Sequence, residues 1–182
     1  MKEEIIISGF GGQGVLSMGK LIAYAGIADN KNVTWLPAYG AEQRGGTANV
    51  TVIVSDQKIY SPILNTCTTA ILLNQPSLER FLPYIKPGGT LIYDTFGIQI
   101  PPKRDDIHIY ELNAMDTAAE MRNIKVFNML ILGGLLRVRP FVKLENIKEA
   151  LFKTLPKRHH DLIPINLEAL KKGMEIVKEI NN

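Results

Sequence analysis

Residues 9–14 read Gly-Phe-Gly-Gly-Gln-Gly, and they are the part of this chain whose residue types and spacing most suggest chemistry. They follow the apolar run at residues 5–7 and precede a stretch of helical periodicity that opens at Val15. A glycine-rich turn between a strand and a helix leaves backbone N–H groups uncovered at the helix N-terminus, which suits an anion or a close-packed neighbour. The first, second and fourth glycines also have the GxGxxG spacing of a dinucleotide-binding turn. The motif therefore suggests NAD or FAD binding as the first hypothesis to test.

The rest of the nucleotide-binding pattern is missing from this sequence. NAD-binding domains carry an acidic residue about 20 residues beyond the glycines, at the end of the second strand, to hold the ribose hydroxyls. The corresponding segment, residues 35–39, has no carboxylate, and the first acid after it is Glu42 in the following loop. No Gly-Lys-Ser/Thr follows the glycines, since Lys20 lies inside the predicted helix. Two interpretations stay open: nucleotide binding, and glycines that permit tight packing or the approach of another chain.

A second group of special residues lies in the loop at residues 38–46. Its aromatic, charged and glycine members are Tyr39, Glu42, Arg44, Gly45 and Gly46. In a parallel α/β sheet this loop leaves the carboxyl end of the second strand, on the same edge as the glycine turn. We therefore expect its side chains to project into one cleft with Gly11, Gly12, Gln13 and Gly14. Arg44 can bind a carboxylate or phosphate there, or pair with Glu42, and we favour a functional or interface role over a solvated loop.

Other polar positions give weaker signals. Asn128 is the polar exception on an apolar helix, so its side chain needs a partner, either the backbone of the glycine turn or a neighbouring subunit. Asp94, at the end of its predicted strand, either acts in the cleft or caps the following turn. Cys67 is expected to be small and semi-buried, and His159–His160 to lie on the surface. Without a nucleophile–base pair, paired carboxylates or a metal cluster, the sequence assigns no catalytic residue and no metal site.

Composition restricts the class of protein. The chain has 182 residues, 46% apolar and 21% charged, with a net charge of +3, which is typical of a soluble globular domain. Its lysines are spread along the chain, so no nucleic-acid partner is expected. No apolar run is long enough for a membrane span and no signal peptide opens the chain, so we expect a cytoplasmic protein with no membrane partner. A single cysteine excludes an internal disulfide, a Cys-based zinc site and a self-contained iron–sulfur cluster.

Periodicity predicts one α/β domain over residues 1–182, with a Rossmann-like, mostly parallel sheet, a β-hairpin insertion, helices on both faces and a helical C-terminus. The predicted strands are residues 4–8, 33–36, 47–54, 69–74, 90–93 and 107–111. The predicted helices are residues 12–28, 75–85, 114–122, 125–137, 143–154 and 166–180. The first strand–helix–strand unit predicts a parallel, right-handed crossover. The hairpin is expected to turn at residues 55–57 into a strand at residues 58–60.

Several of these motifs occur together in one known family. They are the glycine turn at residues 9–14, Tyr39-Gly-Ala-Glu-Gln-Arg-Gly-Gly46, Val54-Ser-Asp56 followed by Ser61-Pro62, and Asn128 with Leu132-Gly133. With them, the chain resembles the gamma subunit, equivalent to domain III, of 2-oxoacid:ferredoxin oxidoreductases. The resemblance covers nearly the whole chain, and two glycine motifs in this order are more specific than either motif alone.

The resemblance implies an accessory subunit of a multi-subunit enzyme, inactive in isolation. Such enzymes oxidatively decarboxylate a 2-oxoacid with coenzyme A and give acyl-CoA, CO2 and reduced ferredoxin. The implied partners are alpha-type and beta-type subunits and a small ferredoxin-like delta subunit. The complex is expected to use thiamine diphosphate, Mg, iron–sulfur clusters and coenzyme A, none of which is assigned to this chain. The glycine turn, the Tyr39–Gly46 loop and Asn128 would then face coenzyme A or the other subunits.

Some alternatives stay open within and outside this family. Residues 34–39 and 47–50 resemble most closely family members that act on branched-chain 2-oxoacids such as ketoisovalerate, or on 2-oxoglutarate, although pyruvate also fits. Stoichiometry and contact with coenzyme A are left undecided. Outside the family, residues 9–14 also fit a free-standing Rossmann-type nucleotide-binding enzyme or sensor, or a scaffold domain whose glycine turn is purely structural.

Overall fold

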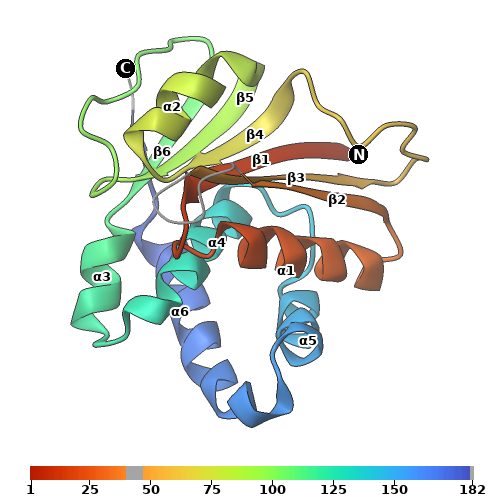
Figure 1. The fold of residues 1–182 in the computed structure, drawn as a ribbon, viewed down its shortest axis with the longest axis vertical. Helices are drawn as coiled ribbons and strands as arrows, with labels where there is room; N and C mark the ends of the chain where they lie inside the picture. The colour runs from red at the N-terminus through yellow and green to blue at the C-terminus, as the bar shows by residue number, and fades with distance from the viewer. Residues whose placement is uncertain (40–46, 181–182) are drawn as a thin grey trace.

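A seven-stranded sheet carries the fold, and helices pack against both of its faces (Figure 1). The computed structural model describes residues 1–39 and 47–180. The strands are β1 Lys2–Phe10, β2 Asn32–Tyr39, β3 Thr47–Ser55, β4 Cys67–Leu72, β5 Ile85–Asp94, β6 His108–Leu112 and β7 Lys178–Ile180. The α-helices are α1 Val15–Ala28, α2 Gln75–Phe81, α3 Ala114–Glu120, α4 Phe127–Val138, α5 Leu144–Thr154 and α6 Ile163–Ile176.

The centre of the sheet is parallel, as predicted. In the order β2-β3-β1-β4-β5-β6-β7, β4 pairs in parallel with β1 and with β5, and β5 pairs in parallel with β6. Parallel strands covered on both faces need nearly continuous apolar residues, and β1 and β4 are buried over almost their whole length. The flanks are antiparallel, because β3 runs against β1 and β2, and β7 runs against β6.

The hairpin predicted at residues 55–60 is wrong. Residues 58–60 form no strand, and β3 instead pairs antiparallel with β2, the strand that precedes it. The hydroxyl of Ser55 accepts the N–H of Gln57 at 3.0 Å, which closes a local turn and does not send the chain back along β3. β1 and β2 do run in the same direction, as the strand–helix–strand unit predicts, but β3 lies between them.

Side chains of β1 alternate between two apolar cores. Ile5 and Ile7 belong to the larger core, which also holds residues of α1, α4, α5 and α6, whereas Ile6 belongs to a smaller core with residues of α2. Figure 1 shows α2 on one side of the sheet and α1, α4, α5 and α6 on the other. The prediction of helices on both faces is therefore confirmed.

The C-terminal helix ends earlier than predicted. α6 stops at Ile176, and β7 then pairs with β6 at residues 109–111. The apolar helical stripe continues in the sequence as far as Val177, which is why periodicity alone extends the helix. Pairing with β7 satisfies backbone groups that β6 would otherwise leave open at the sheet edge, and this favours a strand over a further helical turn.

Two helices diverge from neighbouring parallel strands at one point of the sheet. α1 follows β1 and packs on one face, whereas α2 follows β4 and packs on the other. In open α/β sheets, ligands bind at the carboxyl ends of the strands where the connections diverge in this way. The glycine turn after β1 lies at this switch point.

Candidate functional site at the carboxyl edge of the sheet

The glycine turn joins β1 to α1 through two residues whose backbone conformation favours glycine. The φ angle is +96° at Gly12 and +75° at Gly14. Gly14 is also the N-cap of α1, and no side chain caps this helix end. Any other residue type would be strained at either position. The turn thus presents the first backbone amides of α1 without a side-chain cap.

The outer side of the turn is open. A Cβ atom added at Gly11 or Gly12 would have no heavy atom within 4 Å among the residues described. Gly11 has no positive φ, so neither packing nor backbone conformation requires glycine there. Phe10, directly before it, is 42% exposed. An exposed aromatic ring beside an uncovered backbone is typical of a contact surface.

The inner side of the turn is held by two amide side chains. Oε1 of Gln13 accepts the N–H of Phe10 at 2.6 Å, and its Nε2 donates to the carbonyl of Leu73 at 3.2 Å. Asn128, in the first turn of α4, lies against Gly14, where an added Cβ would be 2.7 Å from the Asn128 Cβ. The structure therefore brings the glycine turn and Asn128 together.

The Tyr39–Gly46 loop begins and ends at this same edge. Tyr39 is the last residue of β2 and Thr47 is the first of β3. Thr47 pairs with Phe10, the last residue of β1, so the chain leaves and re-enters the sheet beside the glycine turn. The remaining predicted site residues, which lie outside the described part of the chain, are Glu42, Arg44, Gly45 and Gly46.

A third segment, which the sequence analysis did not name, joins the edge. Gly97 packs so closely on the Leu73 carbonyl that a Cβ there would be 2.0 Å from its oxygen. Oε1 of Gln75 accepts the backbone N–H groups of residues 99 and 100, both at 3.1 Å. This segment carries Phe96, which is 72% exposed. Its sequence signal is a Phe-Gly pair directly after a predicted strand.

Asp94 caps a helix. Its Oδ1 accepts the N–H groups of Ala114 at 2.8 Å and Met115 at 3.1 Å, the first two residues of α3. The side chain is buried. Burial raises the pKa of this carboxyl group against the opposing effect of the backbone N–H bonds. The bonds of Oδ1 support the capping alternative, at α3 instead of the turn directly after β5.

Cys67 and the histidine pair lie away from this edge. Cys67, the first residue of β4, is fully buried instead of semi-buried, and burial raises the pKa of its thiol to about 12. His159 and His160 are partly exposed in the turn before α6, and Nε2 of His160 lies 3.1 Å from the carbonyl oxygen of Leu155. Neither position combines an exposed nucleophile with a base.

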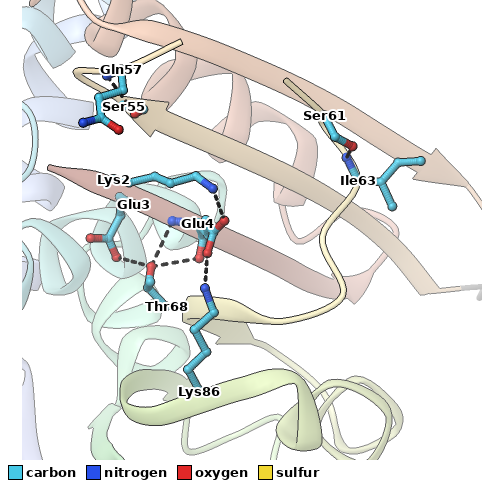
Figure 2. A network of polar contacts seen from close by, with 9 residues as sticks. All are labelled: Lys2, Glu3, Glu4, Ser55, Gln57, Ser61, Ile63, Thr68 and Lys86. Atoms are coloured by element: carbon cyan, nitrogen blue, oxygen red, sulfur yellow. Dashed lines mark hydrogen bonds and ion pairs between the residues drawn. The ribbon is translucent and has the colours of Figure 1, made fainter. Parts of the chain in front are cut away.

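A group of charged side chains lies at the opposite, amino edge of the sheet (Figure 2). The Glu4 carboxylate pairs with Lys2 at 2.5 Å and also with Lys86, and the hydroxyl of Thr68 donates to Glu3 at 3.0 Å. Burial raises the pKa of Glu4, but the hydrogen bonds and charges of the two lysines outweigh burial and lower it overall. These partnered carboxylates are typical of a stabilising network and not of an acid–base pair.

The described segments of the carboxyl edge offer groups suited to binding. The segments at residues 10–14, 73–75 and 96–100 offer backbone amides, carboxamides and exposed apolar side chains, but no acid, base or nucleophile. Across residues 1–39 and 47–180, no group of three or more His, Cys, Asp or Glu could hold a metal ion. No helix in these ranges has both the length and the apolar character needed to cross a bilayer.

Comparison with known proteins identifies one protein family along nearly the whole chain. Residues 4–176 match the family model described as pyruvate ferredoxin/flavodoxin oxidoreductase. The chain is 34% identical over 173 residues to the ketoisovalerate oxidoreductase subunit VorA of Methanothermobacter marburgensis. That match covers 94% of this chain but 36% of VorA, so the chain spans about a third of this relative.

Among solved structures, this chain matches one subunit along nearly its full length and a second, longer chain over part of its length. The gamma subunit of keto/oxoacid ferredoxin oxidoreductase from Geobacter sulfurreducens has a TM-score of 0.83 and 26% identity, covering 97% of this chain and 96% of its own. The 2-oxoglutarate:ferredoxin oxidoreductase from Magnetococcus marinus, solved with 2-oxoglutarate, coenzyme A and succinyl-CoA bound, has a TM-score of 0.86 and 29% identity, covering 96% of this chain and 30% of that chain. This chain therefore belongs to the pyruvate ferredoxin/flavodoxin oxidoreductase family.

Proposed function

We propose that this chain is the gamma-type subunit of a 2-oxoacid:ferredoxin oxidoreductase, and that its 182 residues act as one domain. The enzyme would convert a 2-oxoacid and coenzyme A to acyl-CoA and CO2 and pass the electrons to ferredoxin. The full-length likeness to a gamma subunit supports this role, as does the likeness to a segment of longer oxidoreductase chains. Ketoisovalerate and 2-oxoglutarate, named for the relatives, are the substrates we favour over pyruvate.

One observation carries the role we assign to this chain: the outer side of the glycine turn is open. Gly11 is exposed, needs no special φ and has no neighbour within 4 Å of an added Cβ among residues 1–39 and 47–180. A glycine with no internal reason to be glycine fits a position where another molecule approaches the backbone. We propose that residues 9–14, Tyr39–Gly46 and Asn128 form the edge that meets the alpha-type and beta-type subunits. A small delta subunit would complete the complex.

The expected cofactors would be held mainly by those partners. The chain has one cysteine, Cys67, and it is buried at the start of β4, so it fits no iron–sulfur cluster. Coenzyme A is the one expected cofactor that the carboxyl edge suits, because the uncapped N-terminus of α1 can receive phosphate oxygens. We therefore propose that coenzyme A, where it touches this chain, does so at the glycine turn, and that thiamine diphosphate and Mg are bound elsewhere in the complex.

Co-expression from its own locus tests the proposal. We expect the chain to co-purify with two larger subunits, and the complex to reduce a viologen dye only with a 2-oxoacid and coenzyme A. In that complex, Gly11→Ala should leave the unfolding midpoint of the chain unchanged. It should weaken assembly or raise the KM for coenzyme A by about fivefold or more, since one methyl group in a packed interface costs at least ~1 kcal/mol.

A matched control adds the same methyl group at the other edge of the sheet. Ser61→Thr keeps the hydroxyl that accepts the Ile63 N–H at 3.1 Å, and Ser61 is exposed (Figure 2). It should change neither assembly nor KM. A chain that purifies alone from native lysate, or that binds NAD or FAD at micromolar concentration in calorimetry, would support the free-standing nucleotide-binding alternative. A Gly11→Ala complex identical to wild type would support a purely structural glycine turn.

A further inference from the structure

The carboxamide of Gln13 spans the switch point of the sheet. Its Oε1 accepts the N–H of Phe10, at the end of β1, and its Nε2 donates to the carbonyl of Leu73, just after β4. The backbone N–H of Gln13 also donates to the Phe10 carbonyl at 3.2 Å. Phe10 and Gln13 are therefore bonded to each other in both directions, and the side chain of Gln13 joins this closed turn to the neighbouring strand.

The rest of the turn has little to hold it in place. Within the part of the chain that the structure describes, Gly11 and Gly12 have no packing neighbours for a side chain, and glycine loses more conformational freedom on ordering than any other residue. Without an anchor, this segment would sample many conformations, and a binding partner would have to order it. Phe10 is held in the sheet by its pairing with Thr47, and the side chain of Gln13 adds the link from the turn to Leu73, at the end of β4.

The acceptor of that bond is itself fixed. The Leu73 carbonyl lies against Gly97, where an added Cβ would be only 2.0 Å from the oxygen. The segment that follows Gly97 is anchored by the two N–H bonds to Gln75. Leu73 thus sits between two loops of the carboxyl edge, and Gln13 ties the glycine turn to this rigid point.

We infer that Gln13 is a positioning residue: it holds Gly11 and Gly12 in the conformation that a partner subunit or coenzyme A meets. Each polar end of its carboxamide already makes one hydrogen bond within the chain, and these two bonds fix the orientation of the side chain. The inference that the held conformation serves assembly rests on the proposed function. The hydrogen bonds that hold the turn do not depend on that function.

Two substitutions separate the two bonds of Gln13. Gln13→Ala removes both, whereas Gln13→Glu keeps the acceptor for the Phe10 N–H and loses the donor to Leu73. In the full chain, the Phe10 amide should exchange with solvent about fivefold to tenfold faster in Gln13→Ala and within about twofold of wild type in Gln13→Glu. Gln57→Ala, at an exposed glutamine on the amino edge, is the matched control and should change nothing.

The co-expressed complex supplies the second measurement. Both Gln13 variants should weaken assembly or raise the KM for coenzyme A by about fivefold when measured below the onset of unfolding. Loss of the hydrogen bonds should also lower the thermal midpoint of the free chain by a few degrees. A residue with a purely structural role would shift the midpoint but leave assembly and KM unchanged. Unchanged exchange at Phe10 in Gln13→Ala would overturn the inference, as would normal assembly and KM despite faster exchange. If the wild-type chain itself does not assemble, the proposed function fails, and the exchange data still decide whether Gln13 holds the turn.

Discussion

Gly14→Ala should destabilise the chain more than any other alanine substitution in the glycine turn. Gly14 combines a φ of +75° with close contact to another helix. An added Cβ would lie 2.7 Å from Cβ and 2.9 Å from Cγ and Nδ2 of Asn128. Because the Cβ of Asn128 is fixed to the backbone of α4, rotation of that side chain cannot remove the clash.

The magnitude follows from the two contributions. A left-handed conformation costs a non-glycine residue about 1–2 kcal/mol. Overpacking against a fixed neighbour costs about 1–3 kcal/mol more. We therefore expect Gly14→Ala to lower the free energy of unfolding by about 2–5 kcal/mol. Gly11→Ala, with no positive φ and no neighbour within 4 Å among the described residues, should stay within about 0.5 kcal/mol of wild type.

A double-mutant cycle with Asn128→Gly tests this division. Asn128→Gly alone should cost about 0.5 kcal/mol or less in helix propensity, because asparagine is itself a weak helix former. Combined with Gly14→Ala it removes the atoms that clash, so the double variant should recover about 1–3 kcal/mol relative to the sum of the single costs. Urea unfolding followed by circular dichroism measures all four proteins.

Two results would refute this reasoning. If the losses of unfolding free energy in the two single variants simply add, the Asn128 side chain does not clash with an alanine at position 14. The packing of α4 on the glycine turn would then be wrong. If Gly14→Ala costs no more than Gly11→Ala, the left-handed conformation of Gly14 is wrong as well. Either outcome would remove the structural basis for placing Asn128 at this edge.

Three further predictions concern the rest of the sheet. Arg139→Gln should lower the free energy of unfolding, measured in urea, by about 1.5–3 kcal/mol, which is more than an ordinary surface ion pair contributes. The reason is that it leaves the buried Glu3 carboxylate without the guanidinium at 2.7 Å. A loss below about 0.5 kcal/mol would contradict this ion pair. The lowered pKa of Glu4 contributes stability that is present above pH 4.5 and is lost as pH falls through the folded-state pKa. Lys86→Met should therefore reduce the slope of stability against pH on the acid side. A slope equal to that of the wild type would argue against the pairing of Glu4 with Lys86. The Cys67 thiol, buried and with its pKa raised to about 12, should react with a disulfide reagent at pH 8 only as fast as the chain unfolds, and rapid labelling of folded protein would rule out this burial.

Local pattern predicted the elements well but not their order in the sheet. A continuous run such as Ile5-Ile6-Ile7 is typical of a strand covered on both faces, and β1 is such a strand. The insertion of β3 between β1 and β2 depends on pairs such as Ile7 with Val50, which lie far apart in sequence. Nothing in residues 47–54 distinguishes a strand that pairs on both sides from one that turns back at Ser55.

The sequence predicted the parts of the candidate site that depend on residue type, but not those that depend on contacts with backbone atoms. The sequence placed the glycine turn between a strand and a helix, and it recognised that Asn128 needs a partner. It could not reveal that Gln13 bonds to the backbone carbonyl of Leu73, since a carbonyl carries no residue signature. For the same reason Gly97 was overlooked, because its contact with that carbonyl appears only once β4 and β5 lie side by side.

The two edges of the sheet satisfy their backbone and charged groups differently, and this difference bears on where partners bind. At the amino edge, Glu4 pairs with two lysines, and Glu3 pairs with Arg139 and accepts hydrogen bonds from hydroxyl groups, so little polar capacity is left for another molecule. At the carboxyl edge, Gln13 holds the glycine turn from the inner side, while Gly11 has no neighbours on the outer side among the described residues. A surface that is rigid beneath and open above loses little entropy when a partner covers it. On the proposed function, Gly14 serves stability and Gly11 serves partner contact, so alanine at Gly14 should mainly lower the stability of the chain, whereas alanine at Gly11 should mainly weaken assembly.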